Sequence, residues 1–184
     1  SNGHDLNVGV NYSDDTWMFN ASLGVTPQRR TIDRKVGKLY ADTAMNMIDF
    51  QPMIWMSWRK KEMRVSLNYN GNTRQPSLSD LMPLTDNSNP LYITRGNPDL
   101  KQMFSHNIRL NFQNSPKGIS ANLGGQVEQN SVTQVMIYDV QTGGRETYPV
   151  NINGNWNLFG GASWWKRFGP FSLSCLLYTS DAAD

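Results

Sequence analysis

Apolar and polar residues alternate along most of this chain, and that alternation restricts its fold more than any other feature. Every second residue from Leu6 to Tyr12 is apolar, and the residues between them are Asn or Gly. The same period of two recurs in residues 17–25, 48–58, 65–69, 108–112, 119–127 and 150–158. It is the period of β-strands with one apolar face. We therefore predict an all-β fold, an antiparallel up-and-down meander of about eight strands.

The connections between these expected strands are alternately short and long. Short ones follow Tyr12, Trp58, Phe112 and Trp165, and longer ones follow Val25, Tyr69 and the strand that ends near Tyr138. Transmembrane β-barrels show this asymmetry, because their short turns face the periplasm and their long loops face outside. We therefore predict a partial transmembrane β-barrel, in which the polar stretch from Pro27 to about Asn46 is one of the long loops.

The two faces of the expected sheet differ in chemistry. One face is apolar, and the other is rich in Asn, Ser, Gly, Gln and Arg, as a wet or plug-filled lumen requires. Val65, Leu67, Tyr69, Ile108, Leu110 and Phe112 are expected to point outwards, and Asn68, Asn107 and Arg109 inwards. Aromatic residues beside the short turns would form a girdle at one membrane interface: Tyr12, Trp17, Trp58, Trp164 and Trp165. A soluble β-sandwich would show the same alternation, with its apolar face turned to a core.

Charge and composition exclude several classes of protein. The 17 Lys and Arg residues nearly balance the 15 Asp and Glu residues, so no overall field points to nucleic acid. No apolar run reaches the roughly 18 residues of a transmembrane helix. The first residues, SNGHDLNVGVNYS, contain no signal peptide, so either the protein is cytosolic or its start is missing.

The last ten residues, CLLYTSDAAD, break the alternation of the strand before them. They match a translated transposase sequencing adapter, so we expect residues 175–184 to be a non-native tail and residues 1–174 to be a partial barrel domain. Cys175 is the only cysteine. The expected native portion therefore has no disulfide, thiolate metal site or cysteine nucleophile.

Side chains with catalytic or metal-binding chemistry are sparse. His4 and His106 have no second ligand at metal spacing, and no Ser-His-acid set or phosphate-binding glycine loop is visible. We therefore expect no enzyme and no cofactor. A basic segment of the first long loop could contact lipopolysaccharide phosphates or an anionic ligand, although such loops are usually only solvated: Arg29, Arg30, Arg34, Lys35 and Lys38.

One long loop resembles a known family. The stretch RQPSLSDLMPLTDNSNPLYITRGNPDLKQMFSHNIRLNFQ is similar to a loop of the TonB-dependent receptor-like outer-membrane β-barrel proteins of Bacteroidota. The matching residues are Arg74, Pro76, Ser77, Leu81, Pro83, Asp86, Asn87, Pro90, Gly96, Asn97, Pro98 and Leu100. The family usually continues with Pro-Glu, where this chain has Gln102-Met103, a departure that is expected to loosen the exit from the loop without disturbing the strand.

The prolines of this loop bias the residues before them towards extended backbone, and Gly96 can supply a positive φ. The loop can therefore be an ordered rim that helps to capture a ligand, a rigid brace of the barrel mouth, or both. The candidate residues are Arg74, Pro76, Asp86, Asn87, Pro90, Tyr92, Arg95, Gly96, Asn97 and Pro98.

The resemblance implies a piece of a receptor in the cell outer membrane that takes up an unidentified ligand. The whole protein would hold a plug inside about 22 strands, and the TonB complex would pull on that plug. Its partners would be outer-membrane lipid, lipopolysaccharide, its own plug, TonB and the ligand, with no nucleic acid. Two alternatives remain open, a complete small barrel with an adhesive or structural role and a soluble carbohydrate-binding β-sandwich.

Overall fold

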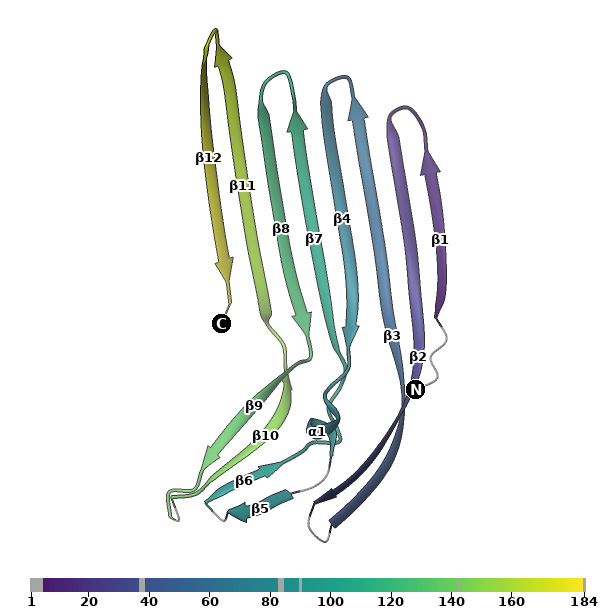
Figure 1. Cartoon of the computed structure of the whole chain (residues 1–184), viewed down its shortest axis with the longest axis vertical. Coiled ribbons are helices and arrows are strands. Elements are labelled where there is room, and N and C mark those ends of the chain that lie inside the picture. The colour runs from purple at the N-terminus through teal and green to yellow at the C-terminus, as the bar shows by residue number, and fades with distance from the viewer. Residues whose placement is uncertain (1–4, 37–38, 83–84, 90, 142, 184) are drawn as a thin grey trace.

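The computed structural model describes residues 5–36, 39–82, 85–89, 91–141 and 143–183, with side chains left out at residues 30, 32–36, 39–45 and 86–88. Eight of its strands form one antiparallel sheet, in which each strand lies beside its neighbours in chain order (Figure 1). The strands are β1 (Leu6–Ser13), β2 (Trp17–Val36), β3 (Leu39–Lys60), β4 (Met63–Arg74), β7 (Met103–Asn114), β8 (Ile119–Gln129), β11 (Asn155–Phe168) and β12 (Phe171–Ala182). The described parts of β1 and β12 do not pair with each other, so the sheet is an open part of a barrel. The predicted meander is confirmed.

The turns have the predicted asymmetry. The connections β1–β2, β3–β4, β7–β8 and β11–β12 are tight and lie together at the top of Figure 1. The β4–β7 and β8–β11 connections lie at the opposite end, as do the long extensions of β2 and β3. One end of the sheet therefore has only short turns, and the other has the long connections.

Cross-strand pairing places most of the apolar residues of these strands on one face, with Trp55 among the exceptions. One row across the sheet consists of Val10, Ala21, Ile54, Tyr69 and Ile108, and the adjacent row on the other face consists of Asn11, Asn20, Trp55, Asn68 and Arg109. The apolar face is open, since Ile108 is 52% exposed and Leu110 is 42% exposed. In the described part of the chain no second sheet packs on it. The sandwich alternative is therefore wrong.

Aromatic residues mark both ends of the outer face. At the short-turn end Trp17 pairs with Trp58, and their ring centroids are 6.4 Å apart. Tyr12 and Trp164 share this face, but Trp165 points to the other one because successive strand residues alternate. The prediction of Trp165 in the girdle was therefore wrong. At the long-loop end the outer face carries a second aromatic set that the sequence analysis missed: Phe50, Tyr69, Phe104, His106 and Trp156.

A smaller sheet lies at the long-loop end. Its order is β5 (Thr85–Asn89), β6 (Tyr92–Arg95), β10 (Arg145–Ile152) and β9 (Ser131–Tyr138), and the short helix α1 (Leu78–Leu81) lies beside it in Figure 1. β6 and β10 come from different long connections and pair in parallel. A series of neighbouring hairpins does not include such a pair, so the sequence analysis did not anticipate it.

The segment from Pro27 to Asn46 is not a loop, which corrects another expectation. β2 and β3 continue through it as a paired ribbon, from Pro27 opposite Ile48 to Val36 opposite Leu39. Where β2 and β3 pair only with each other, both faces of the ribbon can be solvated, so its strands need no apolar face and the period of two disappears. The basic residues from Arg29 to Lys35 therefore lie on a strand, and Lys38 lies outside the described residues.

β12 continues through the segment expected to be non-native. Phe171 and Leu173 point to the outer face, and Ser172 and Ser174 to the inner face, as in the other strands. From Cys175 onwards this order fails: Leu176 and Tyr178 point inwards and Asp181 points outwards. The origin of these residues stays a prediction. No helix in the described ranges is long and apolar enough to cross a membrane.

Candidate functional site

Two regions are distinguished by name. The wall consists of β1, residues 17–27 of β2, residues 48–60 of β3, and strands β4, β7, β8, β11 and β12. The rim consists of α1, β5, β6, β9, β10 and residues 96–102, which contain most of the sequence-derived candidate residues.

The rim begins with a short capped helix. The Ser77 hydroxyl accepts a hydrogen bond from the Asp80 backbone N–H at 3.2 Å, which satisfies a free donor at the start of α1. The helix ends at Met82, whose ψ of 125° is extended, as expected of a residue that precedes a proline in the sequence. This turn brings the Met82 backbone towards the chain that leaves the loop.

Gly96 and Asn97 lie against that helix. A Cβ on Gly96 would be 1.9 Å from the Met82 carbonyl oxygen, so the glycine is required by close approach of two backbones. It does not have the positive φ expected from the sequence. The Asn97 backbone N–H donates to the Asp80 carbonyl oxygen, and its side-chain oxygen accepts from the Asp99 N–H at 3.0 Å. Residues 96 to 99 therefore form one fixed turn.

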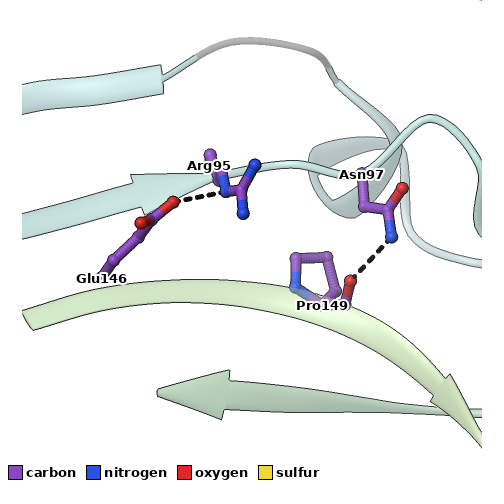
Figure 2. A network of polar contacts seen from close by, with 4 residues as sticks. All are labelled: Arg95, Asn97, Glu146 and Pro149. Carbon is purple, nitrogen blue, oxygen red and sulfur yellow. Dashed lines mark hydrogen bonds and ion pairs between the residues drawn. The ribbon is translucent and has the colours of Figure 1, made fainter. Parts of the chain in front are cut away.

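Contacts across the β6–β10 pair join the two long connections. Figure 2 shows the Asn97 amide donating to the Pro149 carbonyl oxygen at 3.0 Å and Arg95 forming an ion pair with Glu146. The Arg95 guanidinium also lies 4.5 Å from the centre of the Tyr148 ring. Since these residues belong to connections about fifty positions apart, the contacts make the two loops one unit.

The other face of the same strand pair carries a second Arg–Tyr contact. Arg145 is opposite Tyr92 in the register, and its guanidinium lies 4.7 Å from the Tyr92 ring centre. The Arg145 backbone N–H donates to the Leu91 carbonyl oxygen at 2.9 Å. Tyr92 remains 53% exposed, so this contact lies on the surface of the rim.

Asn151 lies where the rim meets the long-loop end of the wall. Its side-chain oxygen accepts from the Lys101 N–H at 2.7 Å, and its amide donates to the Lys101 carbonyl at 3.0 Å and the Asn130 carbonyl at 2.7 Å. Asn130 has a positive φ of 55° and donates its N–H to the Asn153 side chain at 2.7 Å. Backbone groups that leave the ladders are therefore paired by asparagine side chains.

The rim has a small core of its own. The buried hydrophobic residues in the described part of the chain are Leu81, Met82 and Leu100, and none of them is in the wall. Pro149 is also fully buried, and it lies where the Asn97 amide bonds to β10. Burial of one such side chain contributes about 1.5 to 3 kcal/mol. This core and the hydrogen bonds around it hold the loops in one shape.

The structure brings only some of the candidate residues together. Arg95, Gly96 and Asn97 meet β10 or α1, and Tyr92 meets Arg145. The others lie apart: Pro76 is buried before α1, Pro98 is exposed, and Arg74 borders a hollow of about 430 Å³ on the inner face of the wall. The side chains of Asp86 and Asn87 and the whole of Pro90 lie outside the described part. None of these positions tests the role of any candidate residue.

The stretch TGGRETYPVNINGNW of the second long connection also resembles the next extracellular turn of the family, but the sequence analysis singled out none of its residues. Glu146, Tyr148, Pro149 and Asn151 were not singled out, although they make most of the contacts between the loops. Pro149 was the available signal that this segment is special. Proline has no backbone N–H to donate, so within sheets it is confined to edge strands, strand starts and bulges.

No group of three or more His, Cys, Asp or Glu side chains within the described ranges could hold a metal ion. His106 lies on the outer face, where its Nδ1 is 3.0 Å from the Tyr69 hydroxyl and its ring contacts Phe104 edge-on. His4 is outside the described residues. His106 therefore belongs to the aromatic set at the long-loop end of the wall.

The short-turn end holds one shifted carboxyl group. The Tyr12 hydroxyl donates to Asp14 at 2.6 Å, and the backbone N–H groups of Trp17 and Thr16 donate to it at 2.6 and 2.7 Å. These hydrogen bonds hold the pKa of the exposed Asp14 carboxyl below its ordinary value, and the bond from Tyr12 has the largest effect. The ionised carboxylate therefore fixes the β1–β2 turn.

Comparison with known proteins agrees with this architecture. Residues 8–171 match the model of the outer membrane protein beta-barrel family. The siderophore receptor PirA from Pseudomonas aeruginosa has a similar fold, with a TM-score of 0.59 at 12% sequence identity. The similarity covers 98% of this chain and 43% of that receptor, so the chain spans less than half of its length. No curated protein sequence matches significantly. Neither comparison points to an enzyme family.

Proposed function

This chain belongs to the outer membrane protein beta-barrel family, and on that premise we propose that it is one sector of a TonB-dependent receptor-like barrel that takes part in energised ligand uptake. The outer membrane is its location. Whole receptors of this kind enclose a plug within about 22 strands. In this proposal the wall contacts lipid and the plug, and the rim forms part of the outer entrance.

The braced rim is the observation that carries the proposal. Two long connections form one small sheet with its own core, joined by the Asn97–Pro149 hydrogen bond and the Arg95–Glu146 ion pair. An entrance that must present a constant shape to a ligand requires loops that are ordered before binding. The resemblance of residues 74–113 to the receptor-like proteins of Bacteroidota supports the same assignment.

Energised uptake is tested in cells that make the intact protein. We expect a plug domain to be encoded upstream of Ser1, and ligand accumulation to stop when TonB is deleted or a protonophore removes the proton gradient. Binding of ligand at the cell surface should persist in both cases. Accumulation that continues without TonB and without a proton gradient would contradict the proposal.

A complete small barrel is the second candidate, favoured by the eight strands of the wall. The free edges of β1 and β12 distinguish the two ideas, because lipid cannot satisfy unpaired backbone groups. If this is a sector, residues 1–174 refolded in detergent should give no heat-modifiable band and should form broad oligomers. A monodisperse, protease-resistant monomer would instead establish the small barrel.

We propose further that residues 175–184 are not native. The family match stops at residue 171, and the inward and outward alternation of β12 fails from Cys175 onwards. Amplifying the gene with primers beyond this point and reading it without transposase adapters would test the idea. Recovery of the same ten codons inside a longer reading frame would refute it.

A further inference from the structure

An arginine and a phenylalanine share one row on the inner face of the wall. The part of this row that follows Trp55 crosses four strands and contains Asn68, Arg109, Gly124 and Phe159, each directly opposite the next. The guanidinium of Arg109 lies 5.3 Å from the centre of the Phe159 ring. Large aromatic rings are a minority on this mainly polar face, which also carries Trp55 and Trp165, so the position of Phe159 needs a reason.

Gly124 provides the space for that ring. A Cβ on Gly124 would be between 2.3 and 3.0 Å from the outer carbon atoms of the Phe159 ring. The ring therefore lies across the glycine backbone and leans from β11 towards β7, where Arg109 is. Aromatic residues that cover a glycine in this way also stabilise barrel strands. Covering the glycine explains the ring, but it does not explain the guanidinium or the polar hollow beside them.

The hollow next to this pair is wide and rich in hydrogen-bond donors. It measures about 630 Å³ and is lined by Arg109, Phe159, Gln126 and four asparagines, Asn68, Asn70, Asn107 and Asn111. None of its described lining residues is acidic. Amide groups and a guanidinium can donate several hydrogen bonds to one carboxylate or phosphate.

The charges on the inner face of the wall favour the same class of ligand. Five arginines point inwards, Arg59, Arg64, Arg74, Arg109 and Arg167. Two acidic residues of the wall, Asp49 and Glu128, also point inwards, and both carboxylates accept hydrogen bonds. The donors are Gln28 and Gln75 for Asp49, and Gln126 and Ser131 for Glu128. A lumen lined in this way attracts anions.

We propose that the hollow around Arg109 and Phe159 is a subsite for an anionic ligand that carries a planar group. Arg109 is the charge partner, the neighbouring asparagines donate hydrogen bonds to the same anionic group, and the Phe159 ring is a platform for the planar part. The inference deepens the proposed function, because it names a class of ligand for the lumen.

The test is binding to the purified full-length protein in detergent, measured by titration calorimetry with three matched probes. Isophthalate has a ring and two carboxylates, isophthalamide has the ring without charge, and cyclohexane-1,3-dicarboxylate has the charge without a flat ring. We expect isophthalate to bind, cyclohexane-1,3-dicarboxylate to bind more weakly, and isophthalamide not to bind detectably. Binding of a probe to the purified protein does not depend on TonB. If the probe binds but cells do not take it up, the subsite stands and energised transport is contradicted.

Substitutions locate the subsite. Arg109→Gln should weaken isophthalate about 10-fold to 100-fold. Phe159→Leu should weaken isophthalate about 2-fold to 10-fold and leave cyclohexane-1,3-dicarboxylate unchanged. Gly124→Ala, which displaces the ring, should resemble Phe159→Leu. Two controls should bind normally: Arg64→Gln, which removes an inward arginine away from the hollow, and Gly160→Ala, whose Cβ would meet only ordinary contacts.

Three results would overturn the proposal. The first is the absence of isophthalate binding to the unaltered protein, which is also the result expected if the plug fills the hollow. The second is an equal loss in Arg109→Gln and Arg64→Gln, which would mean a diffuse field without a site. The third is equal affinity for isophthalate and isophthalamide. A heat-modifiable band in every variant would show that the barrel remains folded.

Discussion

The wall and the rim bury apolar surface in opposite ways. The wall leaves large side chains open on its outer face, including Val10 at 63% and Leu123 at 51% exposure, whereas the rim buries Leu81, Met82 and Leu100. The wall is therefore stable only where lipid covers that face, while the rim has the small core of a water-soluble structure. The outer face of the wall is adapted to lipid and the rim to water, and the position of the apolar residues differs accordingly.

The polar contacts of the two regions differ as well. On the inner face of the wall they join side chains to side chains, as Ser120 joins Ser163 at 2.6 Å. In the rim, besides side-chain pairs such as Arg95 and Glu146, several join a side chain to the backbone of another loop, as Asn97 joins Pro149 and Asn151 joins Lys101. In the wall the ladders already fix the backbone, so its polar side chains remain available to the lumen. In the rim, polar side chains instead pair backbone groups that have no partner in a β-ladder.

The largest expected effect comes from placing a charge on the outer face of the wall. Leu110→Arg in the intact protein should lower the free energy of unfolding in lipid vesicles by about 2 to 4 kcal/mol if the residue lies near the midplane. Gln113→Arg, on the inner face of the same strand, is the matched control and should have little effect. Equal losses of unfolding free energy in both variants would contradict the assignment of the outer face to lipid and the inner face to the lumen.

Gly96→Ala should disrupt the rim and leave the wall intact. The new Cβ would overlap the Met82 carbonyl oxygen, and such overpacking costs about 1 to 3 kcal/mol. Hydrogen exchange measured by mass spectrometry should become faster in residues 76–102 and 130–154 and stay unchanged in β7 and β8. Thr94→Ala, at an exposed position of the same loop, serves as the control. Faster exchange in the wall would show that the two regions are not separable.

Asn151→Ala should loosen the junction between rim and wall. Its loss leaves the Lys101 N–H and two backbone carbonyl groups without their side-chain partner, which should lower the local opening free energy by about 1 kcal/mol. Gln141→Ala at the exposed tip of the β9–β10 connection is the control. Unchanged exchange at Lys101 in Asn151→Ala would mean that water replaces these bonds at no cost.

The Arg95–Glu146 ion pair should contribute less. Its side chains are 47% and 36% exposed, so solvent screens the attraction. A double-mutant cycle of Arg95→Ala and Glu146→Ala should give a coupling free energy of about 0.2 to 1 kcal/mol that decreases with added salt. A coupling well above this range, or one insensitive to salt, would make the ion pair a main support of the rim.

The smallest effect is expected at the β1–β2 turn. Because hydrogen bonds lower the pKa of Asp14 in the folded protein, they stabilise the turn above the unfolded pKa of this carboxyl, and the stabilisation is lost as the pH falls through the folded value. Exchange of the Thr16 and Trp17 amides, corrected for its intrinsic pH dependence, should accelerate over that acid range. Asp14→Asn should remove the transition, and a transition that persists in this variant would assign it to another group.

The period of two was enough to predict the wall, because one face meets lipid along every strand and the other meets the lumen. It failed where that contrast ends: the ribbon from Pro27 to Met47 continues as β2 and β3 paired with each other, and such a ribbon needs no apolar face because both of its sides can be solvated. The parallel β6–β10 pair depends on contacts between distant segments, which local patterns do not encode. Gly96 and Asn97 were recognisable from the family resemblance, but their partners in β10 were not.

The most direct test of the account is the environment of successive residues in one wall strand. Spin labels would be attached to single cysteines at positions 107 to 112 of β7 in the intact protein, with any other cysteine replaced by serine. Collisions with oxygen and with a water-soluble nickel chelate would be measured in vesicles. We predict high oxygen and low nickel accessibility at Ile108, Leu110 and Phe112, and the reverse at Asn107 and Asn111. Labels at the three apolar positions that neither reagent reaches would contradict a lipid-facing wall.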